Sequence, residues 1–477
     1  MVSCTAAMQV RSSAHRLDPP GAAQRAVVPA VVVVLLLSFA LKLAVLYLVG
    51  DIRPFRDEQR YLEAGVSLAA GRGIEYEAPN WDELHAPPLY PLFMGLVTRL
   101  GGGAYESKVA QVFLSTFTVA FLYLLARRWF DVRAALWGTG LAAFYPTLVA
   151  FTHYNWVETF FLFWFCAALL ALFDARGAPA SPARTFAGGL LFGAAALTRA
   201  EAFYLLPLLV LWIGAREGRA RPILAKGGSL VLGGLLALLP WIGYAYSEHG
   251  ALVPISTGST GFWHFSYNAY PPSNQDLGVA QAASRAPHKD EARRRARGDD
   301  PIERMRKEQR RALQFIAENP LLCVRRFFVR VGLLLNPTSF LIRHVRKGYY
   351  TRAHGERPER AAIPPAAADA IVWSTVAAYL AVSVLAVLGL SVMPAGPRAF
   401  LLLVTLYFVV VYGATYAISR YRLSFMPLLA LAAGYAVAHR AECLERLRRP
   451  GTAIPVFLVL AVLGFAWSLH FDKLWNH

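Results

Sequence analysis

Long apolar runs alternate with polar stretches along this chain. The first run, residues 27–49, is long enough to cross ~30 Å of hydrocarbon at ~1.5 Å per residue. Lys42 interrupts this run, and we interpret it as snorkelling toward the surface rather than facing the bundle interior. Ten further apolar segments follow: 105–126, 134–152, 156–173, 186–198, 203–214, 227–246, 366–392, 399–418, 423–438 and 453–470. The pattern predicts an all-α polytopic membrane protein with about eleven transmembrane helices.

Composition supports this fold class. Of 477 residues, 56% are hydrophobic and only 16% are charged, which is unusual for a soluble protein and ordinary for a polytopic one. The formal net charge of +18 could indicate nucleic-acid binding. In so apolar a chain, positive loops are better explained by anionic lipid head groups. We therefore expect membrane lipids as partners and no nucleic acid.

The distribution of Lys and Arg predicts an orientation, because short cytoplasmic loops carry an excess of both. With residues 1–26 as a cytoplasmic tail, two long segments, 50–104 and 247–365, become extracytoplasmic loops. Residues 27–246 would then form an N-terminal transmembrane module and 366–477 a C-terminal one. The positive residues of the inner loops are Arg127, Arg128, Arg133, Arg176, Arg184, Arg216, Arg219, Arg221, Lys226, Arg398, Arg440, Arg446, Arg448 and Arg449.

The second outer loop contains a helix-start signal. Asp300 is placed to cap a helix, Pro301 occupies its first position, and Glu303 can reach back to the cap. Asn319-Pro320 would end it. The helix is basic and amphipathic, so it could lie along the bilayer or be a solvated helix without a ligand.

An adjacent acidic pair, Asp57-Glu58, follows the first span. On a helix, neighbouring side chains diverge by about 100°, so the pair cannot flank a bond as two glycosidase carboxylates do. One can point into a site while the other orients the helix or binds a metal. Tyr61 shares the face of Asp57 and is a further site candidate. Asp57 could equally be an ordinary residue of a helix N-terminus, where acidic side chains are favoured.

The segment His85-Ala-Pro-Pro-Leu-Tyr-Pro closes the polar part of the first loop. Its prolines fix the backbone and remove N–H donors, which predicts a rigid segment at the membrane interface. His85 could contact a phosphate or hydroxyl there, or be structural. Tyr90 is a second candidate in the same segment.

Further polar residues stand at the outer ends of spans. His153 and Glu158 follow the third span, Arg199 lies between the fifth and sixth, and Arg420 and Arg422 between the ninth and tenth. Arginines at such positions can simply snorkel to head groups. Because all share one side of the membrane with the acidic pair, they could also form a cationic phosphate clamp that faces a carboxylate base.

The motifs resemble those of a known superfamily. The loop sequence F-R-D-E-Q-R-Y-L-E-A-G, followed by G-R-G and H-A-P-P-L-Y-P-L-F, is similar to the first outer loop of the GT-C glycosyltransferases. The most similar branch is that of protein mannosyltransferases and lipid A aminoarabinose transferases. The runs Y-P-T-L-V-A-F-T-H-Y-N-W-V-E-T, L-T-R-A-E and R-Y-R-L-S-F-M-P-L-L-A agree, so the resemblance extends over residues 27–440. His85 replaces a common lysine, and Ser424 a common proline.

The resemblance implies a GT-C fold and an inverting glycosyltransferase in the cell inner membrane. Such an enzyme moves a hexose or pentose from a polyprenyl-phosphate carrier to a hydroxyl of a protein, lipid or glycan on the extracytoplasmic face. Asp57 would be the general base, and Glu58 would support it or hold a divalent metal cation. The donor-phosphate ligands would be Arg420, Arg422, Arg199 and His85.

Two other classes of function compete with the transferase. A transporter or lipid flippase should place ionisable residues in mid-span and often shows internal repeats. Here the charges gather at outer span ends and in two outer loops, which favours chemistry at the membrane surface. A non-enzymatic assembly or binding protein would leave the acidic pair without a role.

Overall fold

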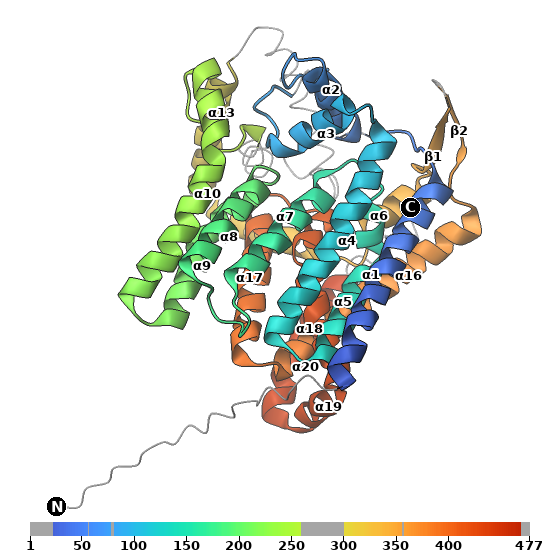
Figure 1. Ribbon diagram of the computed structural model, residues 1–477, viewed down its shortest axis with the longest axis vertical. Coiled ribbons are helices and arrows are strands. Elements are labelled where there is room, and N and C mark those ends of the chain that lie inside the picture. Colours follow the sequence, from blue (N-terminus) through green and yellow to red (C-terminus); the bar gives the residue numbers. More distant parts are fainter. Residues whose placement is uncertain (1–21, 56, 78–80, 259–299, 355–356, 469–477) are drawn as a thin grey trace, which may run out of the picture.

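The protein is almost entirely helical. The computed structural model describes residues 22–55, 57–77, 81–258, 300–354 and 357–468 (Figure 1). The N-terminal helices are α1 (Ala22–Val49), α2 (Asp57–Ala69), α3 (Leu89–Arg99), α4 (Ala104–Trp129), α5 (Val132–Ala143), α6 (Pro146–Phe151), α7 (Val157–Leu172), α8 (Pro182–Ala196), α9 (Glu201–Glu217) and α10 (Ala220–His249). The C-terminal helices are α13 (Pro301–Glu318), α14 (Pro320–Leu334), α15 (Phe340–Arg346), α16 (Pro365–Val392), α17 (Ala395–Ala414), the 3₁₀ turn η1 (Ser419–Ser424), α18 (Met426–Ala438), α19 (Arg440–Arg448) and α20 (Pro450–Ser468).

The described residues of each of the eleven predicted apolar segments are mostly helical. The segment 134–152 divides into α5 and α6 because Pro146 cannot continue a helix and instead starts the second one. Of the described residues, five helices are long and apolar enough to span a membrane: α1, α4, α10, α16 and α17. The bent pair of α19 and α20 would be a sixth. The polytopic helical fold is therefore confirmed, whereas the count of eleven is not, since α18 has only 13 residues.

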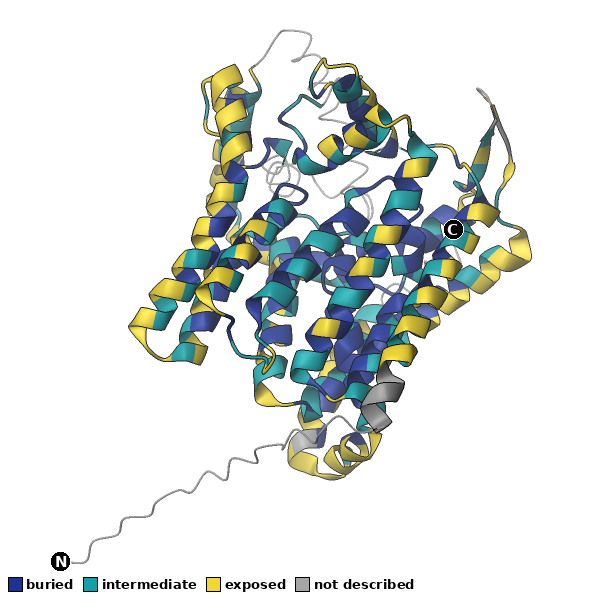
Figure 2. Ribbon diagram, viewed as in Figure 1, coloured by how far each residue is buried: buried dark blue, intermediate teal, exposed yellow. Residues whose placement is uncertain are grey.

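The long helices present apolar side chains outward, as membrane spans do. Leu36 on α1 is 61% exposed, and Leu239 on α10 is 53% exposed. Figure 2 shows these outward faces as exposed, whereas the inner helices are buried. Lys42 is the opposite case, because only 1% of it is exposed. The interpretation that Lys42 snorkels to the surface is therefore wrong: its side chain faces the bundle interior.

Close helix contacts in the bundle depend on glycines. A Cβ at Gly434 of α18 would lie 2.0 Å from the backbone nitrogen of Gly138 on α5. A Cβ at Gly189 of α8 would lie 2.1 Å from the carbonyl oxygen of Leu230 on α10. Small residues at such crossings let helix backbones approach closely, which is the usual way that membrane helices pack. These contacts fix the scaffold under the site.

One end of the bundle carries the polar elements. There α2, α3 and α13 gather with an antiparallel hairpin of β1 (Thr351–His354) and β2 (Arg357–Ala361), whereas α19 lies at the opposite end (Figure 1). The hairpin was not predicted; its Arg352 forms a bridge to Ile52 just after α1. Helix α13 begins as predicted, because Asp300 accepts the Ile302 N–H at 3.0 Å.

The two long predicted loops, residues 50–104 and 247–365, meet at this end. The predicted tail, residues 1–26, and the middle of the second loop, 259–299, lie largely or wholly outside the described residues. The predicted division of the chain into modules, and which end of the bundle faces outward, stay predictions.

Candidate active site

Helix α2 begins at the acidic pair and turns its two carboxylates in different directions. The Asp57 side chain is 28% exposed, and its Oδ2 accepts a hydrogen bond from the Arg420 guanidinium at 3.2 Å. Glu58 is only 1% exposed. Its Oε2 accepts the Phe55 N–H at 3.1 Å and its Oε1 the Asn155 N–H at 2.8 Å. Asp57 thus faces an accessible site, whereas Glu58 ties α2 to the turn that precedes α7.

Burial raises the pKa of the Glu58 carboxyl, while the Lys108 charge and the two backbone N–H groups act in the opposite direction. Both oxygens already accept hydrogen bonds from the protein, so this geometry favours an anchoring role over a metal-binding one. Within the described ranges, no three His, Cys, Asp or Glu residues are grouped so as to hold a metal ion. The divalent cation remains a prediction that these contacts do not support.

Arg420 lies between two carboxylates from opposite ends of the site. Its Nε is 3.4 Å from Glu158 Oε1, and its Nη2 is 3.2 Å from Asp57 Oδ2. The same Glu158 oxygen accepts a hydrogen bond from Arg199 at 3.2 Å, and Arg199 also contacts Glu201 at 3.0 Å. Negative and positive groups therefore alternate through five residues from α2, η1, α7, α9 and the turn before α9. The fold therefore brings three of the predicted site residues, Arg199, Arg420 and Glu158, into one charged network with Asp57.

Aromatic rings enclose the two arginines. Arg199 lies 4.6 Å from the Tyr421 ring centroid and donates a hydrogen bond to the Tyr412 hydroxyl at 3.4 Å. Arg420 lies 4.9 Å from the Trp156 ring. Cation–π contacts of this kind hold a guanidinium where little water is present. Burial alone would lower the pKa of Arg420, but the nearby Glu158, Tyr421 and Asp57 raise it above its ordinary value, so Arg420 stays charged.

Arg422 is directed elsewhere, although it is only two positions from Arg420. It is 1% exposed, donates a hydrogen bond to the Asn336 carbonyl and lies 3.9 Å from the centroid of the Tyr379 ring. The 3₁₀ turn η1 sends the two side chains to different partners. The structure therefore does not bring Arg422 to the charged network around Asp57, and its contacts are those of a packing residue.

Arg60 lies at the accessible edge of the site, although it was not among the predicted site residues. It lies one turn after Asp57 on α2, with 3.7 Å between Arg60 Nη1 and Asp57 Oδ1. Its guanidinium also lies 4.6 Å from the Trp81 ring, which stacks on His85 with centroids 4.5 Å apart. His85 is thus close to the site through Trp81. The i, i+3 spacing from Asp57 could have identified Arg60 in advance.

Tyr61 and Tyr90 pack beside the site rather than opening into it. Their rings lie edge to face with centroids 4.9 Å apart, and Tyr90 packs in turn on Phe160 of α7. Both are buried, and burial raises the pKa of the Tyr61 phenol well above its ordinary value. These contacts hold α2 and α3 against the bundle. They are the contacts of a small apolar core.

His153 is buried away from Asp57. Its Nε2 contacts the Lys42 backbone carbonyl at 2.9 Å, and burial lowers the pKa of the ring to about 4. His153 is therefore neutral near pH 7 and fastens the turn before α7 to α1.

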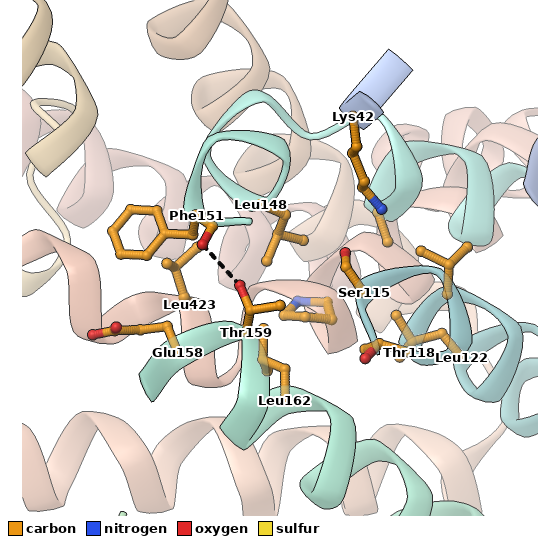
Figure 3. A pocket seen from close by; sticks show the side chains of 13 residues that line it. Lys42, Ser115, Thr118, Leu122, Leu148, Phe151, Glu158, Thr159, Leu162 and Leu423 are labelled. Atoms are coloured by element: carbon orange, nitrogen blue, oxygen red, sulfur yellow. Dashed lines mark hydrogen bonds between the residues drawn. The ribbon is translucent and has the colours of Figure 1, made fainter. Parts of the chain in front are cut away.

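Below the network lies a small cavity of about 20 Å³, room for roughly one water. Figure 3 shows Lys42 reaching toward Ser115 and Thr118, while the carboxylate of Glu158 points away on the far side. The cavity thus adjoins the charged network but is too small for a sugar.

Comparisons with known proteins agree with the motifs. Residues 85–244 match the family model described as dolichyl-phosphate-mannose-protein mannosyltransferase. The undecaprenyl phosphate-alpha-4-amino-4-deoxy-L-arabinose arabinosyl transferase of Pseudomonas aeruginosa PAO1 is 31% identical over 198 residues, which is 39% of this chain. A Pseudomonas fluorescens enzyme of the same description is 31% identical over 153 residues, 31% of this chain and 28% of its own length. The match spans about a third of the length of these curated relatives, 35% for the first.

Two solved structures align over most of the chain at low similarity. The Archaeoglobus fulgidus oligosaccharyltransferase aligns with 94% of this chain and 55% of its own, at 14% identity and a TM-score of 0.47. ArnT from Cupriavidus metallidurans, bound to undecaprenyl phosphate, aligns with 90% of this chain and 81% of its own, at 17% identity and a TM-score of 0.42. The family model and the curated relatives confirm that this chain resembles the GT-C superfamily of membrane glycosyltransferases, as its loop motifs predicted.

Proposed function

We propose that this protein is an inverting glycosyltransferase that uses a polyprenyl-phosphate sugar and acts on the extracytoplasmic face of the cell inner membrane. The observation that carries the proposal is Asp57, a partly exposed carboxylate held by Arg420 at the polar end of a membrane bundle. The names of the family model and of the curated relatives supply the reaction class. On this proposal the N-terminus is cytoplasmic.

Asp57 acts as the general base. As the acceptor hydroxyl attacks C1 of the sugar, its O–H bond breaks and the proton passes to an Asp57 oxygen. The bond between C1 and the phosphate oxygen breaks on the opposite face of the ring, so the anomeric centre inverts. With 28% of its side chain exposed, Asp57 is the most accessible member of the charged network, as a base that meets a substrate must be.

Arg420 and Arg60 stabilise the departing phosphate. The negative charge on that group grows as the C1–O bond breaks, so cations that are already in place lower the barrier. Arg60 is 26% exposed and Arg420 is 16% exposed, which leaves both within reach of a ligand. His85 supports Arg60 indirectly, because it stacks on the Trp81 ring that the Arg60 guanidinium also contacts. Arg199, whose side chain is 6% exposed, acts indirectly: its ion pair holds the Glu158 carboxylate in place.

Glu58 serves as an anchor in this proposal. Its two backbone contacts fix the first turn of α2 and therefore the direction of Asp57. A divalent cation at this site would have to bind the remaining lone pairs of two buried oxygens that already accept these hydrogen bonds. The first experiment should therefore include a chelator arm, in which unchanged transfer shows that no exchangeable metal takes part.

The test is a transfer assay with purified protein in detergent. Undecaprenyl-phosphate aminoarabinose and polyprenyl-phosphate mannose are the first donors to try, because the relatives and the family model carry those names. A membrane extract supplies protein, lipid and glycan acceptors together. Label should move in the wild type and be lost in Asp57→Asn, while the exposed control Asp51→Asn should keep full transfer. Unchanged transfer in Asp57→Asn would remove Asp57 from the mechanism.

One observation favours a second candidate, a lipid flippase. Lys42 is buried within a candidate span and lines a cavity, as ionisable residues of transport pathways do. The discriminating measurement is the movement of labelled polyprenyl lipid across reconstituted vesicles. Movement without sugar transfer from any donor would favour the flippase.

A further inference from the structure

Residues 81–85, which we call the Trp81 wall, form one side of the candidate active site. The Arg60 guanidinium lies 4.6 Å from the centroid of the Trp81 ring, and His85 stacks on the same ring with the centroids 4.5 Å apart. Arg60 in turn lies 3.7 Å from the Asp57 carboxylate. Because a cation–π contact holds a guanidinium over its ring, the position of Trp81 fixes where Arg60 stands at the accessible edge of the site.

Backbone hydrogen bonds join the Trp81 wall to the segment that follows α10. The Thr257 N–H donates to the Leu84 carbonyl at 2.8 Å, and the Gly258 N–H donates to the His85 carbonyl at 3.0 Å. A Cβ at Gly258 would lie 2.3 Å from the His85 carbonyl oxygen, so a larger residue would push the two segments apart. The two predicted outer loops are therefore in direct contact at the wall.

The Asp82 side chain connects the wall to a third element, α13. Arg304 Nη2 lies 2.5 Å from Asp82 Oδ2, and the two side chains are only 10% and 18% exposed. Arg304 is the fourth residue of α13, where the positive end of the helix dipole disfavours a cation. The carboxylate opposite Arg304, rather than the helix itself, therefore favours an arginine at this position. So little exposure also means that salt screens this pair much less than a surface pair.

The next carboxylate, Glu83, holds the wall from the side of α10. Its Oε2 accepts a hydrogen bond from the Tyr244 hydroxyl at 2.9 Å, and its Oε1 contacts His249 Nε2. The Glu83 side chain is 28% exposed, compared with 18% for Asp82. Neighbouring carboxylates thus connect the wall to different helices, and the less exposed of the two connections is the one to α13.

We propose that the ion pair between Asp82 and Arg304 is a clasp with which α13 positions the Trp81 wall, and through it Arg60, for the donor phosphate. The proposal rests on the proposed function in naming that ligand. Asp82 and Arg304 act through the Trp81 ring, so they are positioning residues. Breaking the clasp leaves Arg60 in the chain but releases the ring that holds its guanidinium in place. The protein should then bind the donor phosphate less tightly.

Hydrogen exchange measures whether the clasp holds the wall, without any activity assay. In the full-length protein in detergent, Arg304→Gln should raise deuterium uptake in peptides that cover residues 81–89 and 253–258, because the hydrogen bonds between the two segments open more often. Asp82→Asn should raise it in the same peptides. Arg306→Gln changes an exposed arginine on the same helix and should leave uptake as in the wild type. Equal uptake in Arg304→Gln and Arg306→Gln would overturn the proposal.

Binding of undecaprenyl phosphate measures the consequence for the site. This lipid is the probe because the curated relatives carry its name. Arg304→Gln should weaken its binding several-fold, and in the Arg60→Gln background the same change should have little further effect, since the clasp acts through Arg60. Arg304→Lys should restore most of the affinity, because a single arginine nitrogen makes the contact with Asp82 and an ammonium can replace it.

A merely structural ion pair would give a different result. Losses of affinity that add in the double variant of Arg60 and Arg304 would overturn the positioning role. So would greater exchange at the wall with an unchanged affinity for undecaprenyl phosphate. If the wild type binds neither this lipid nor a polyprenyl-phosphate sugar, the proposed function fails, whereas the exchange measurement still decides whether Arg304 holds the wall.

Discussion

Arg420 and Asp57 are 363 positions apart in sequence, yet Nη2 of the arginine lies 3.2 Å from Oδ2 of the aspartate. The contact joins η1, near the C-terminal end of the chain, to α2, in the first predicted loop. Arg420 also lies 3.4 Å from Glu158, so one guanidinium connects two carboxylates. A ligand phosphate that approaches Asp57 would meet both this guanidinium and that of Arg60, whose side chain is 26% exposed.

Replacing Arg420 should affect catalysis more than folding. We expect Arg420→Gln to lower kcat/KM by about 10²–10³, the usual cost of removing one donor that stabilises charge in a transition state. Arg420→Lys should recover little, since an ammonium cannot bridge Asp57 and Glu158 as a planar guanidinium does. The measurement is steady-state transfer with varied donor. A matched control is Arg398→Gln at the start of α17, away from the site. Equal loss in both variants would contradict the role of Arg420.

Glu158 should be a stability residue as much as a site residue. Its side chain is 3% exposed and faces both Arg199 and Arg420. Glu158→Gln leaves two buried arginines with one carboxylate fewer, and breaking a buried charge network costs about 3–5 kcal/mol. We expect a clear drop in the thermal unfolding midpoint. Glu201→Gln is the control: it removes a carboxylate that is 21% exposed and that, among the described residues, forms an ion pair with Arg199 alone, and it should cost less. The reverse order would show that Glu158 is not the centre of the network.

Local patterns in the sequence predicted the helices well. The described residues of all eleven apolar segments are mostly helical, because an apolar run in lipid has to satisfy its backbone hydrogen bonds internally. The break at Pro146 and the capped start of α13 at Asp300 also follow from residue chemistry. The burial of Lys42 did not follow, because a lysine seven residues from a helix end can either snorkel or face inward, and only packing decides.

The site was predictable in part. Asp57, Arg199 and Arg420 could be grouped because a single topology placed them at one side of the membrane. Which of the two alternating arginines reaches Asp57 depends on the turn of η1, and no periodicity in so short a segment separates Arg420 from Arg422. The aromatic enclosure was not predicted, because only the fold brings the rings of Trp156 and Tyr421 beside the arginines.

Arg60 offers a test of donor binding at the accessible edge. Because 26% of its side chain is exposed, its attraction for a phosphate should be screened by salt. We expect Arg60→Gln to raise the KM for the donor several-fold and to flatten the dependence of KM on ionic strength. The control is Arg72→Gln, a more exposed arginine beyond the end of α2 that pairs with Glu75. Equal shifts in the two variants would mean that Arg60 acts only through general surface charge.

His153 sets an acid limit to stability. Its folded-state pKa is about 4, below the ordinary value near 6.5, so the folded protein disfavours the charged ring. A depressed histidine pKa contributes stability that is fully present above pH 6.5 and declines as the pH falls toward 4. The difference between the two pKa values corresponds to about 3 kcal/mol of stability from His153.

Unfolding midpoints measured between pH 7.5 and 4 should therefore fall with acid in the wild type. In His153→Gln, whose amide can still donate to the Lys42 carbonyl, the curve should be flatter. Two parallel curves would show that other groups, such as the network carboxylates, cause the acid loss.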